Sequence, residues 1–519
     1  MRGAFFYALM AATALHAATP ARLGKVHFAT SCDPAVQARF DTGMAWLHSF
    51  WTSDAIAEFT AVQRQDPGCA IASWGIAMAL QQNPLTGQPP DAARTAQAIG
   101  PLDKARAIGA KTQRERDYLA AVDLIYRHSA TDFAGRRLAY AKAMEALAQR
   151  YPDDTEAQIF YALALEMTAP PTDTTYANQF KAASILQKLL PQQPDHPGIA
   201  HYLVHAYDSP ALASQGLAAA CLYADIAPDS PHALHMPSHI FTRLGLWQRS
   251  VDANVRSAAA AKADGNGQEQ AHAMDYLVYA DLQLGEDGAA KNVVEESAAL
   301  VVNAANFIGP YGVAAMPARY AVERRDWRGA IALQVRPSGF PFTEAITHFA
   351  RGLGFARLQQ DGAAEQEMTQ LAQARDALAA RNDSYWSRQV EVQRLAVAAW
   401  VALSRGQSGQ ALGLMRASAD LEDSMEKHIV TPGAIVPARE LLGDMLLEVR
   451  EPAAALAALE TSAKHEPGRL NGLYDMARAE DALGDRKAAA GLYEKLAALP
   501  GAAGAARPVL QTARAFSGK

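Results

Sequence analysis

The chain has 519 residues, of which 50% are hydrophobic, 8% aromatic and 20% charged, and its formal net charge is −6. Ample aliphatic content excludes wholesale disorder, and a mean hydropathy of −0.11 excludes a polytopic membrane protein. The weakly acidic charge, without a long run of Lys and Arg, offers nucleic acid no general attraction. We therefore expect no nucleic-acid partner.

The first 20 residues are typical of a secretory signal peptide. Arg2 precedes an apolar run over residues 4–12, and a mostly small-residue stretch follows up to Ala18. The run is shorter than the roughly 20 residues that a membrane span needs. A buried first helix is the alternative, but the turn-prone Thr19-Pro20 favours cleavage. We predict a signal peptide at 1–20 and a periplasmic or secreted protein with no membrane span after cleavage.

Export would permit a disulfide, and the chain has three cysteines. Cys32 and Cys69 lie in turn-like segments at the two ends of one predicted helix pair, so we expect a Cys32–Cys69 bridge. Cys221 stands among alanines and is expected to be a buried thiol.

Helical segments end repeatedly in a proline turn that precedes another helix, with proline at positions 67, 152, 194, 228 and 467. Pro194 and Pro228 are 34 residues apart, which is the period of the tetratricopeptide repeat (TPR), a helix–turn–helix unit. The last unit carries the apolar, small and turn positions of a TPR in order, at Leu473, Met476, Ala477, Gly484-Asp485, Ala489 and Tyr493.

From about residue 35 to 500 the sequence resembles the TPR family, of a secreted bacterial type with a histidine-rich pair of repeats. No alternating strand pattern is found. We predict an all-α protein, a right-handed α-solenoid of stacked TPR-like helix–turn–helix units. We divide it into N-terminal TPR-like units (21–135), central TPR units with a histidine-rich concave site (136–345) and C-terminal TPR units (346–519). The resemblance implies a protein or peptide partner in the concave groove and does not imply an enzyme.

Two histidine pairs recur at the repeat period. His201 and His205 are four residues apart, as are His235 and His239, and each residue of the second pair stands 34 after its counterpart in the first. Residues at i and i+4 share one face of a helix. Equivalent helices of stacked repeats lie about 8–10 Å apart. We therefore predict that the four imidazoles converge.

Further polar residues extend this candidate site. Aligning the Leu-Gly turns at 244–245 and 284–285, and then repeating the step of 40 residues, continues the histidine columns with Asp275, Tyr279 and Arg319. Asp208, one turn after His205, is either a further ligand or a partner that holds an imidazole. His232 lies close, off the face of its pair.

Imidazoles beside a carboxylate suit a divalent transition metal, Zn, Cu or Fe. We predict a metal site at His201, His205, His235 and His239, with Asp208, His232, Asp275, Tyr279 and Arg319 as secondary ligands or groove residues. Two alternatives remain open: a groove that binds a small molecule, peptide or protein without metal, and histidines that are structural. No nucleophile, phosphate-loop or dinucleotide motif is present, so any catalysis would depend on the metal. Whether the protein is an enzyme stays open at this point.

Overall fold

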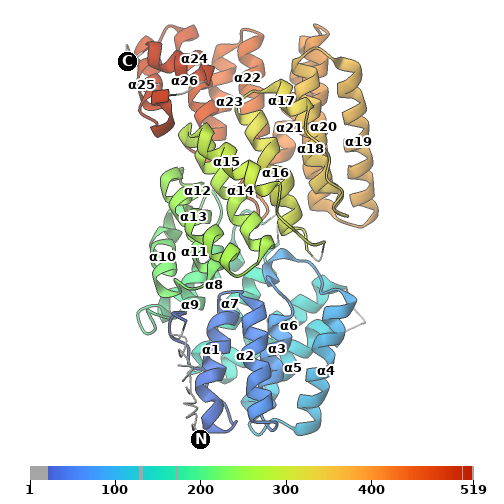
Figure 1. Cartoon of the computed structure of the whole chain (residues 1–519), viewed down its shortest axis with the longest axis vertical. Coiled ribbons are helices and arrows are strands. Elements are labelled where there is room, and N and C mark those ends of the chain that lie inside the picture. The colour runs from blue at the N-terminus through green and yellow to red at the C-terminus, as the bar shows by residue number, and fades with distance from the viewer. Residues whose placement is uncertain (1–20, 128–131, 171–172, 305, 505–506, 517–519) are drawn as a thin grey trace, which may run out of the picture.

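The computed structural model describes residues 21–127, 132–170, 173–304, 306–504 and 507–516, and all regular structure in these ranges is helical. The predicted signal peptide at 1–20 lies outside the described residues. The N-terminal body, at the bottom of Figure 1, consists of α1 (Gln37–His48), α2 (Thr52–Gln65), α3 (Ala72–Ala79), α4 (Ala92–Ile108), α5 (Gln113–Arg127), α6 (Phe133–Arg150), α7 (Thr155–Met167) and α8 (Ala177–Leu189), with short 3₁₀ turns at Pro34–Val36 and Pro84–Thr86.

The central repeats follow in the same stacking direction (Figure 1). They consist of α9 (Pro197–Ala206), α10 (Ala213–Ile226), α11 (Pro231–His235), α12 (Pro237–Arg243), α13 (Trp247–Ala263), α14 (Gly267–Leu284), α15 (Asp287–Ser297), α16 (Ile308–Glu323) and α17 (Trp327–Ile331).

The C-terminal repeats complete the stack at the top of Figure 1. They consist of α18 (Pro341–Arg357), α19 (Asp361–Ala380), α20 (Ser384–Ser404), α21 (Ser408–Asp423), α22 (Ala438–Glu448), α23 (Pro452–His465), α24 (Leu470–Leu483), α25 (Arg486–Ala497), a 3₁₀ turn at Pro500–Gly504 and α26 (Pro508–Phe516). Consecutive helices pack on one another along the whole chain, and the prediction of an all-α solenoid of helix pairs is confirmed.

Proline and aspartate set the helix starts. Pro197, Pro231 and Pro341 occupy the first turns of α9, α11 and α18, where the missing N–H costs no helical hydrogen bond. Asp154 and Asp485 cap α7 and α25 by accepting hydrogen bonds from backbone N–H groups of the first turn. The turns that the sequence marks therefore start the helices that the fold uses.

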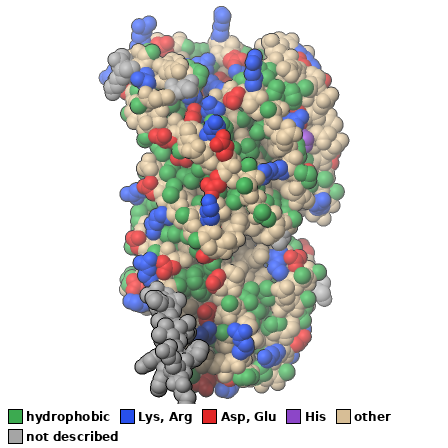
Figure 2. All heavy atoms as spheres, in the orientation of Figure 1, with side chains coloured by type: hydrophobic (Ala, Val, Ile, Leu, Met, Phe, Trp, Pro, Cys, Tyr) green, Lys and Arg blue, Asp and Glu red, His purple; other side chains and the backbone are tan. Residues whose placement is uncertain are grey.

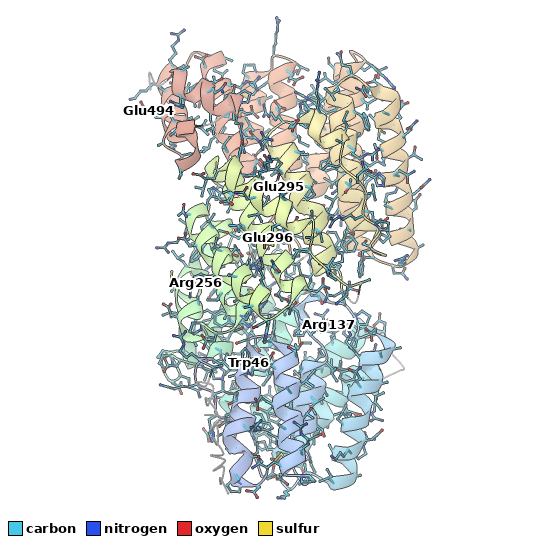
Figure 3. All side chains as sticks on the ribbon, in the orientation of Figure 1. Trp46, Arg137, Arg256, Glu295, Glu296 and Glu494 are labelled. Carbon is cyan, nitrogen blue, oxygen red and sulfur yellow. A yellow bond between two sulfur atoms is a disulfide. The ribbon has the colours of Figure 1, made fainter. Side chains whose placement is uncertain are left out.

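Side chains fill the spaces between neighbouring helices, as Figure 3 shows, and the abundant small residues allow close approach. Gly43 and Gly75 lie against opposite edges of the Phe59 ring, where a Cβ atom would stand 2.9 and 2.6 Å from ring carbons. On the face shown in Figure 2, positive and negative side chains are interspersed and almost no histidine is visible. Half of the 14 histidines are buried, among them His201, His235 and His239.

The C-terminal repeats fold back onto the central ones. Trp247 donates its indole N–H to the carbonyl of Gly468 at 2.9 Å. The segment 424–437, between α21 and α22, crosses α14 and α16: Tyr276 donates to the Thr431 carbonyl at 3.0 Å and Arg319 donates to the Gly433 carbonyl at 2.7 Å. The concave side of the central repeats is therefore covered at this point rather than open along its length.

Cys32 and Cys69 form a disulfide that joins the segment before α1 to the loop after α2. Cys221 on α10 is exposed, so the expectation of a buried thiol is wrong. Ala219 and Ala220 belong to the packed face of the helix, and Cys221 lies on the solvent-exposed face. Among the described residues, no helix combines the length and the apolar character that crossing a membrane requires.

Candidate metal centre

The first histidine cluster, triad 1, consists of His201, His205 and His232 from α9 and α11. One ring nitrogen from each lies within 4.8 Å of the others. The Nε2 atoms of His201 and His205 are 3.1 Å apart. Tyr223 stacks on His201 at 4.9 Å between ring centroids, and Phe50 lies 5.9 Å from His205, so aromatic rings from α10 and the α1–α2 turn support this cluster.

The second cluster, triad 2, consists of His235, His239 and His272 from α11, α12 and α14, all buried. The Nε2 atoms of His235 and His239 are 3.0 Å apart. Met236 between α11 and α12 keeps helical backbone angles, so Pro237 starts α12 without taking His235 out of line. Two equivalent histidine pairs therefore each gain a third imidazole.

Most of these rings are oriented through Nδ1. The Nδ1 of His201 contacts the His48 carbonyl at 2.6 Å, that of His235 contacts Asn254 Oδ1 at 2.6 Å, and that of His239 contacts Asp208 Oδ2 at 2.9 Å. The Nδ1 of His232 lies 3.5 Å from Glu269 Oε2. Hydrogen-bond acceptors at Nδ1 fix the tautomer and leave Nε2 as the electron-pair donor, which is the usual arrangement around metal-binding histidines.

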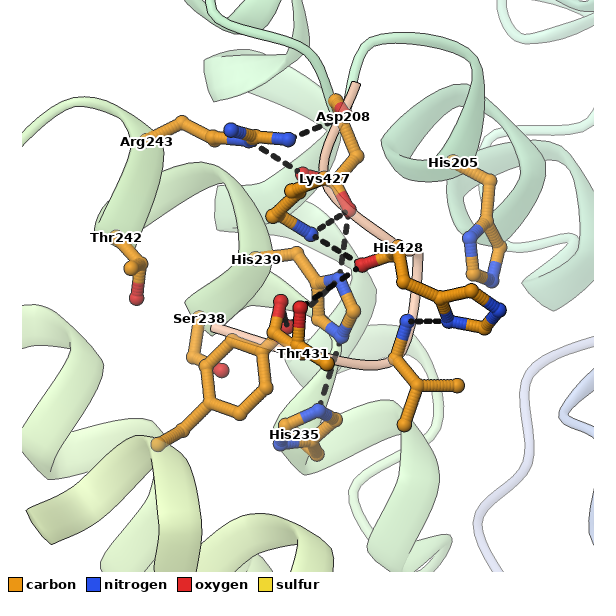
Figure 4. A network of polar contacts seen from close by, with 12 residues as sticks. His205, Asp208, His235, Ser238, His239, Thr242, Arg243, Lys427, His428 and Thr431 are labelled. Atoms are coloured by element: carbon orange, nitrogen blue, oxygen red, sulfur yellow. Dashed lines mark hydrogen bonds and ion pairs between the residues drawn. The ribbon is translucent and has the colours of Figure 1, made fainter. Parts of the chain in front are cut away.

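Asp208 is the polar hub beside triad 2 (Figure 4). Its carboxylate contacts His239, pairs with Arg243 at 3.0 Å and pairs with Lys427 of the segment 424–437 at 2.9 Å. Burial would raise the pKa of Asp208, but Lys427, Arg243 and His239 outweigh it and hold that pKa well below its ordinary value. Asp208 is therefore an anion that orients His239 and ties the covering segment to the site.

Burial keeps the histidines neutral. It lowers the pKa of His239 to about 4 in spite of Asp208, and it lowers the pKa of His272 to about 3 in spite of Glu269. Burial and the neighbouring imidazoles also hold the pKa values of His201, His205 and His235 well below the ordinary value. Neutral imidazole is the form that coordinates a metal ion.

The two triads adjoin one another and open on one pocket. The ring centroids of His205 and His239 are 6.2 Å apart, and those of His232 and His235 are 6.3 Å apart. The pocket has a volume of about 430 Å³ and is reached by members of both triads, His205, His232, His239 and His272. Its outer wall is rich in carboxamides, namely Gln81, Gln82, Asn83, Gln88, Asn266, Gln268, Asn303 and Asn306.

The structure places the other predicted groove residues differently. Asp275 pairs with Arg319 at 2.9 Å, and both are buried where α14 and α16 meet the segment 424–437. Tyr279 donates a hydrogen bond to Glu466 at 2.7 Å and accepts one from Arg469 at 2.6 Å. These three residues stabilise the contact between central and C-terminal repeats and belong to neither triad. His232, expected beside its pair, completes triad 1.

Sequence reasoning missed His272 and Tyr276. They stand 37 residues after His235 and His239, against the 40 residues that the turn alignment used. The difference of three residues is close to one helical turn. It arises because α14 extends further beyond its site residues before the Leu-Gly turn than α12 does. Tyr276, rather than Tyr279, stacks on His239, with 4.9 Å between ring centroids.

A third buried cluster adjoins triad 1. Glu156 of α7 contacts His48 Nε2 and His196 Nε2, each at 2.9 Å. The two imidazoles and burial oppose each other at Glu156, and the imidazoles prevail, so its pKa is lowered. His48 also carries the carbonyl that orients His201. The cluster therefore connects the N-terminal body to the first triad.

The sequence matches no protein-family model and no curated protein. Solved structures of similar fold include the human IFIT1 dimer with m7Gppp-AAAA (TM-score 0.39, 11% identity, 82% of this chain and 89% of that one). The APC/C hetero-tetramer Cut9-Hcn1 (0.33, 11%, 92% and 90%) and the P58(IPK) TPR domain (0.21, 14%, 93% and 98%) are also similar. Likenesses this distant carry no inference about function.

Proposed function

We propose that this protein is an exported TPR-like solenoid that binds two transition-metal ions, one in each histidine triad, at the base of the pocket. The set of four histidines that the sequence suggests becomes six, divided between neighbouring repeats. The disulfide between Cys32 and Cys69 supports export, because such bonds persist in oxidising compartments.

One observation carries the proposal: the meeting of His235 and His239. The amide of Asn254 donates to the Ser250 carbonyl at 2.7 Å, so its oxygen faces His235 and requires an N–H at Nδ1. The carboxylate of Asp208 requires the same of His239. Both Nε2 atoms are then electron-pair donors, and they face each other at 3.0 Å. Two electron-pair donors at this distance repel each other, and a cation between them would remove that repulsion.

The third imidazole distinguishes a metal ion from a proton. A proton bridges two nitrogen atoms, whereas a nitrogen of His272 converges on the same place within 4.8 Å. Three histidines are the protein ligands of catalytic metal sites that keep a further position for water or substrate. Triad 1 repeats the arrangement with His232 as its third member.

Metal content tests this function. Protein purified without a tag, loaded with metal and desalted is expected to retain two ions per chain, measured by inductively coupled plasma mass spectrometry. His205→Ala and His239→Ala should each retain one ion, and the double variant none. His465→Ala, which removes an exposed histidine at the end of α23, should retain both.

Circular dichroism confirms that each variant is folded before its metal is counted. Trace metal in the folded wild-type chain would overturn the proposal and favour a scaffold that binds its partner without metal. Two ions retained by the double variant would overturn it as well, because the ions would then be bound elsewhere.

A further inference from the structure

The ligand set of the two triads is entirely imidazole. Non-haem iron sites commonly combine two histidines with a carboxylate, and manganese and magnesium prefer oxygen ligands. Neither triad contains a carboxylate among its members. Imidazole suits copper, zinc and nickel, and copper forms the strongest complexes of the three as dications. The chemistry of the donors therefore reduces the choice to these metals.

Charge distinguishes between them. The nearest carboxylate of triad 2, Asp208, is already paired with Arg243 and Lys427. Glu269 lies beside His232 of triad 1 and also interacts with His272 of triad 2, so its single charge is shared by both sites. Two adjacent dications would meet little compensating charge here, and Coulomb repulsion scales with the product of the charges. Copper in its Cu(I) state halves each charge and lowers the mutual repulsion about fourfold.

The geometry presents both ions to one small ligand. His205 of triad 1 faces His239 of triad 2 with 6.2 Å between ring centroids, and both line the same pocket. Metal pairs that act jointly on one substrate lie about 3.5–4 Å apart. Each triad supplies three nitrogens, so each ion would keep a coordination position for a further ligand.

We propose that the two ions are copper and that the reduced pair binds one molecule of dioxygen between the triads. Each Cu(I) gives one electron and becomes Cu(II), and dioxygen gains both electrons and becomes a peroxide dianion held by the two ions. No proton and no other reductant is needed for this step. The inference rests on the proposed function, since it requires one ion in each triad.

The test uses copper and dioxygen as the probes. Metal-free protein is loaded with two equivalents of Cu(I) without air and desalted, and its copper is counted before dioxygen is admitted. We expect uptake of one dioxygen per two copper ions, a new near-ultraviolet charge-transfer absorption and no electron paramagnetic resonance signal, because the two Cu(II) ions are magnetically coupled. His465→Ala should behave as the wild-type chain does.

His272→Ala is the diagnostic variant. Retaining copper in triad 1 alone, it should take up no stoichiometric dioxygen, and chemical oxidation should give it the resonance signal of an isolated Cu(II) ion. Wild-type protein that holds two copper ions and takes up no dioxygen would overturn this inference and leave the proposed function standing. Retention of two zinc ions together with refusal of Cu(I) would do the same. Failure to retain two ions of any metal would instead contradict the proposed function.

Discussion

The two triads occupy equivalent places in neighbouring repeats, but their surroundings hold them to different degrees. In triad 2, His235 and His239 each direct Nδ1 at a strong acceptor, Asn254 or Asp208. In triad 1, only His201 has a comparable contact, and His205 Nδ1 has no hydrogen-bond partner among the described residues. Its ring is supported mainly by Phe50.

The difference shows that a repeat and its neighbours contribute different things to a site. The 34-residue period places two histidine pairs side by side. The contacts that orient the rings come from other helices: the end of α1 for His201, and α13 for His235. Preorganised ligands lose less side-chain entropy on binding. We therefore expect triad 2 to bind its ion more tightly than triad 1.

The largest effect is expected when the anion beside triad 2 is removed, because triad 2 should then no longer bind its ion more tightly than triad 1. Asp208→Asn replaces a carboxylate that orients His239, and loss of such a partner typically weakens metal affinity about 10–100-fold. The same change leaves buried Lys427 and Arg243 without their anion, so the midpoint of thermal unfolding should also fall by several degrees. Competition with a chelator of known affinity measures the first effect and calorimetry the second.

Asp229→Asn is the matched control, because it removes a carboxylate whose partner, Arg22, is exposed. It should leave both metal affinities and the unfolding midpoint close to those of the wild-type chain. Unchanged affinity of triad 2 in Asp208→Asn would contradict the orienting role of Asp208.

The order itself can be measured by stepwise removal of metal. No hydrogen bond at Nδ1 fixes the His205 ring, so the ion itself must order this side chain. The entropic cost is roughly 1 kcal/mol, which should make the affinity of triad 1 about fivefold to tenfold lower than that of triad 2. Titration of the fully loaded protein with a chelator should therefore release the ions in two steps.

Two single-site variants assign those steps. His272→Ala keeps the ion of triad 1 and should show only the early step, whereas His205→Ala keeps the ion of triad 2 and should show only the late one. If the assignment is reversed, the hydrogen bonds at Nδ1 do not decide the affinity.

The fold and four of the six triad histidines are readable from sequence for physical reasons, and His232 was expected close by. Proline turns and the period of 34 fix the helix pairs, and i, i+4 spacing places His201 with His205 and His235 with His239. His272 escapes because its helix has a different length between the site and its turn, so a constant period selects Asp275 instead. The repeat period alone does not predict a contact that depends on the length of one helix.

The position of the segment 424–437 over the site could not be predicted from the sequence for another reason. Residues 424–437 carry no repeat signal, and Lys427 is 219 residues from Asp208 along the chain. The sequence predicts an open concave groove, which this segment closes at the histidines because buried polar groups on α14 and α16 bond its carbonyls. Such pairing joins residues that are far apart in the chain, and no single repeat encodes it.

The smallest effect is expected at Glu269, the counterpart of Asp208 in triad 1. Its carboxylate lies 3.5 Å from His232 Nδ1, beyond ordinary hydrogen-bond distance, so it orients the ring weakly. Glu269→Gln should therefore weaken metal binding at triad 1 by only about threefold or less, measured by the same chelator competition. Because Glu269 also interacts with His272, a loss of the same small size is expected at triad 2, while thermal unfolding should stay unchanged. Glu295→Gln, at an exposed position of α15, is the matched control. A loss at Glu269→Gln as large as that at Asp208→Asn would mean that charge beside the ions, rather than orientation of the rings, sets their affinity.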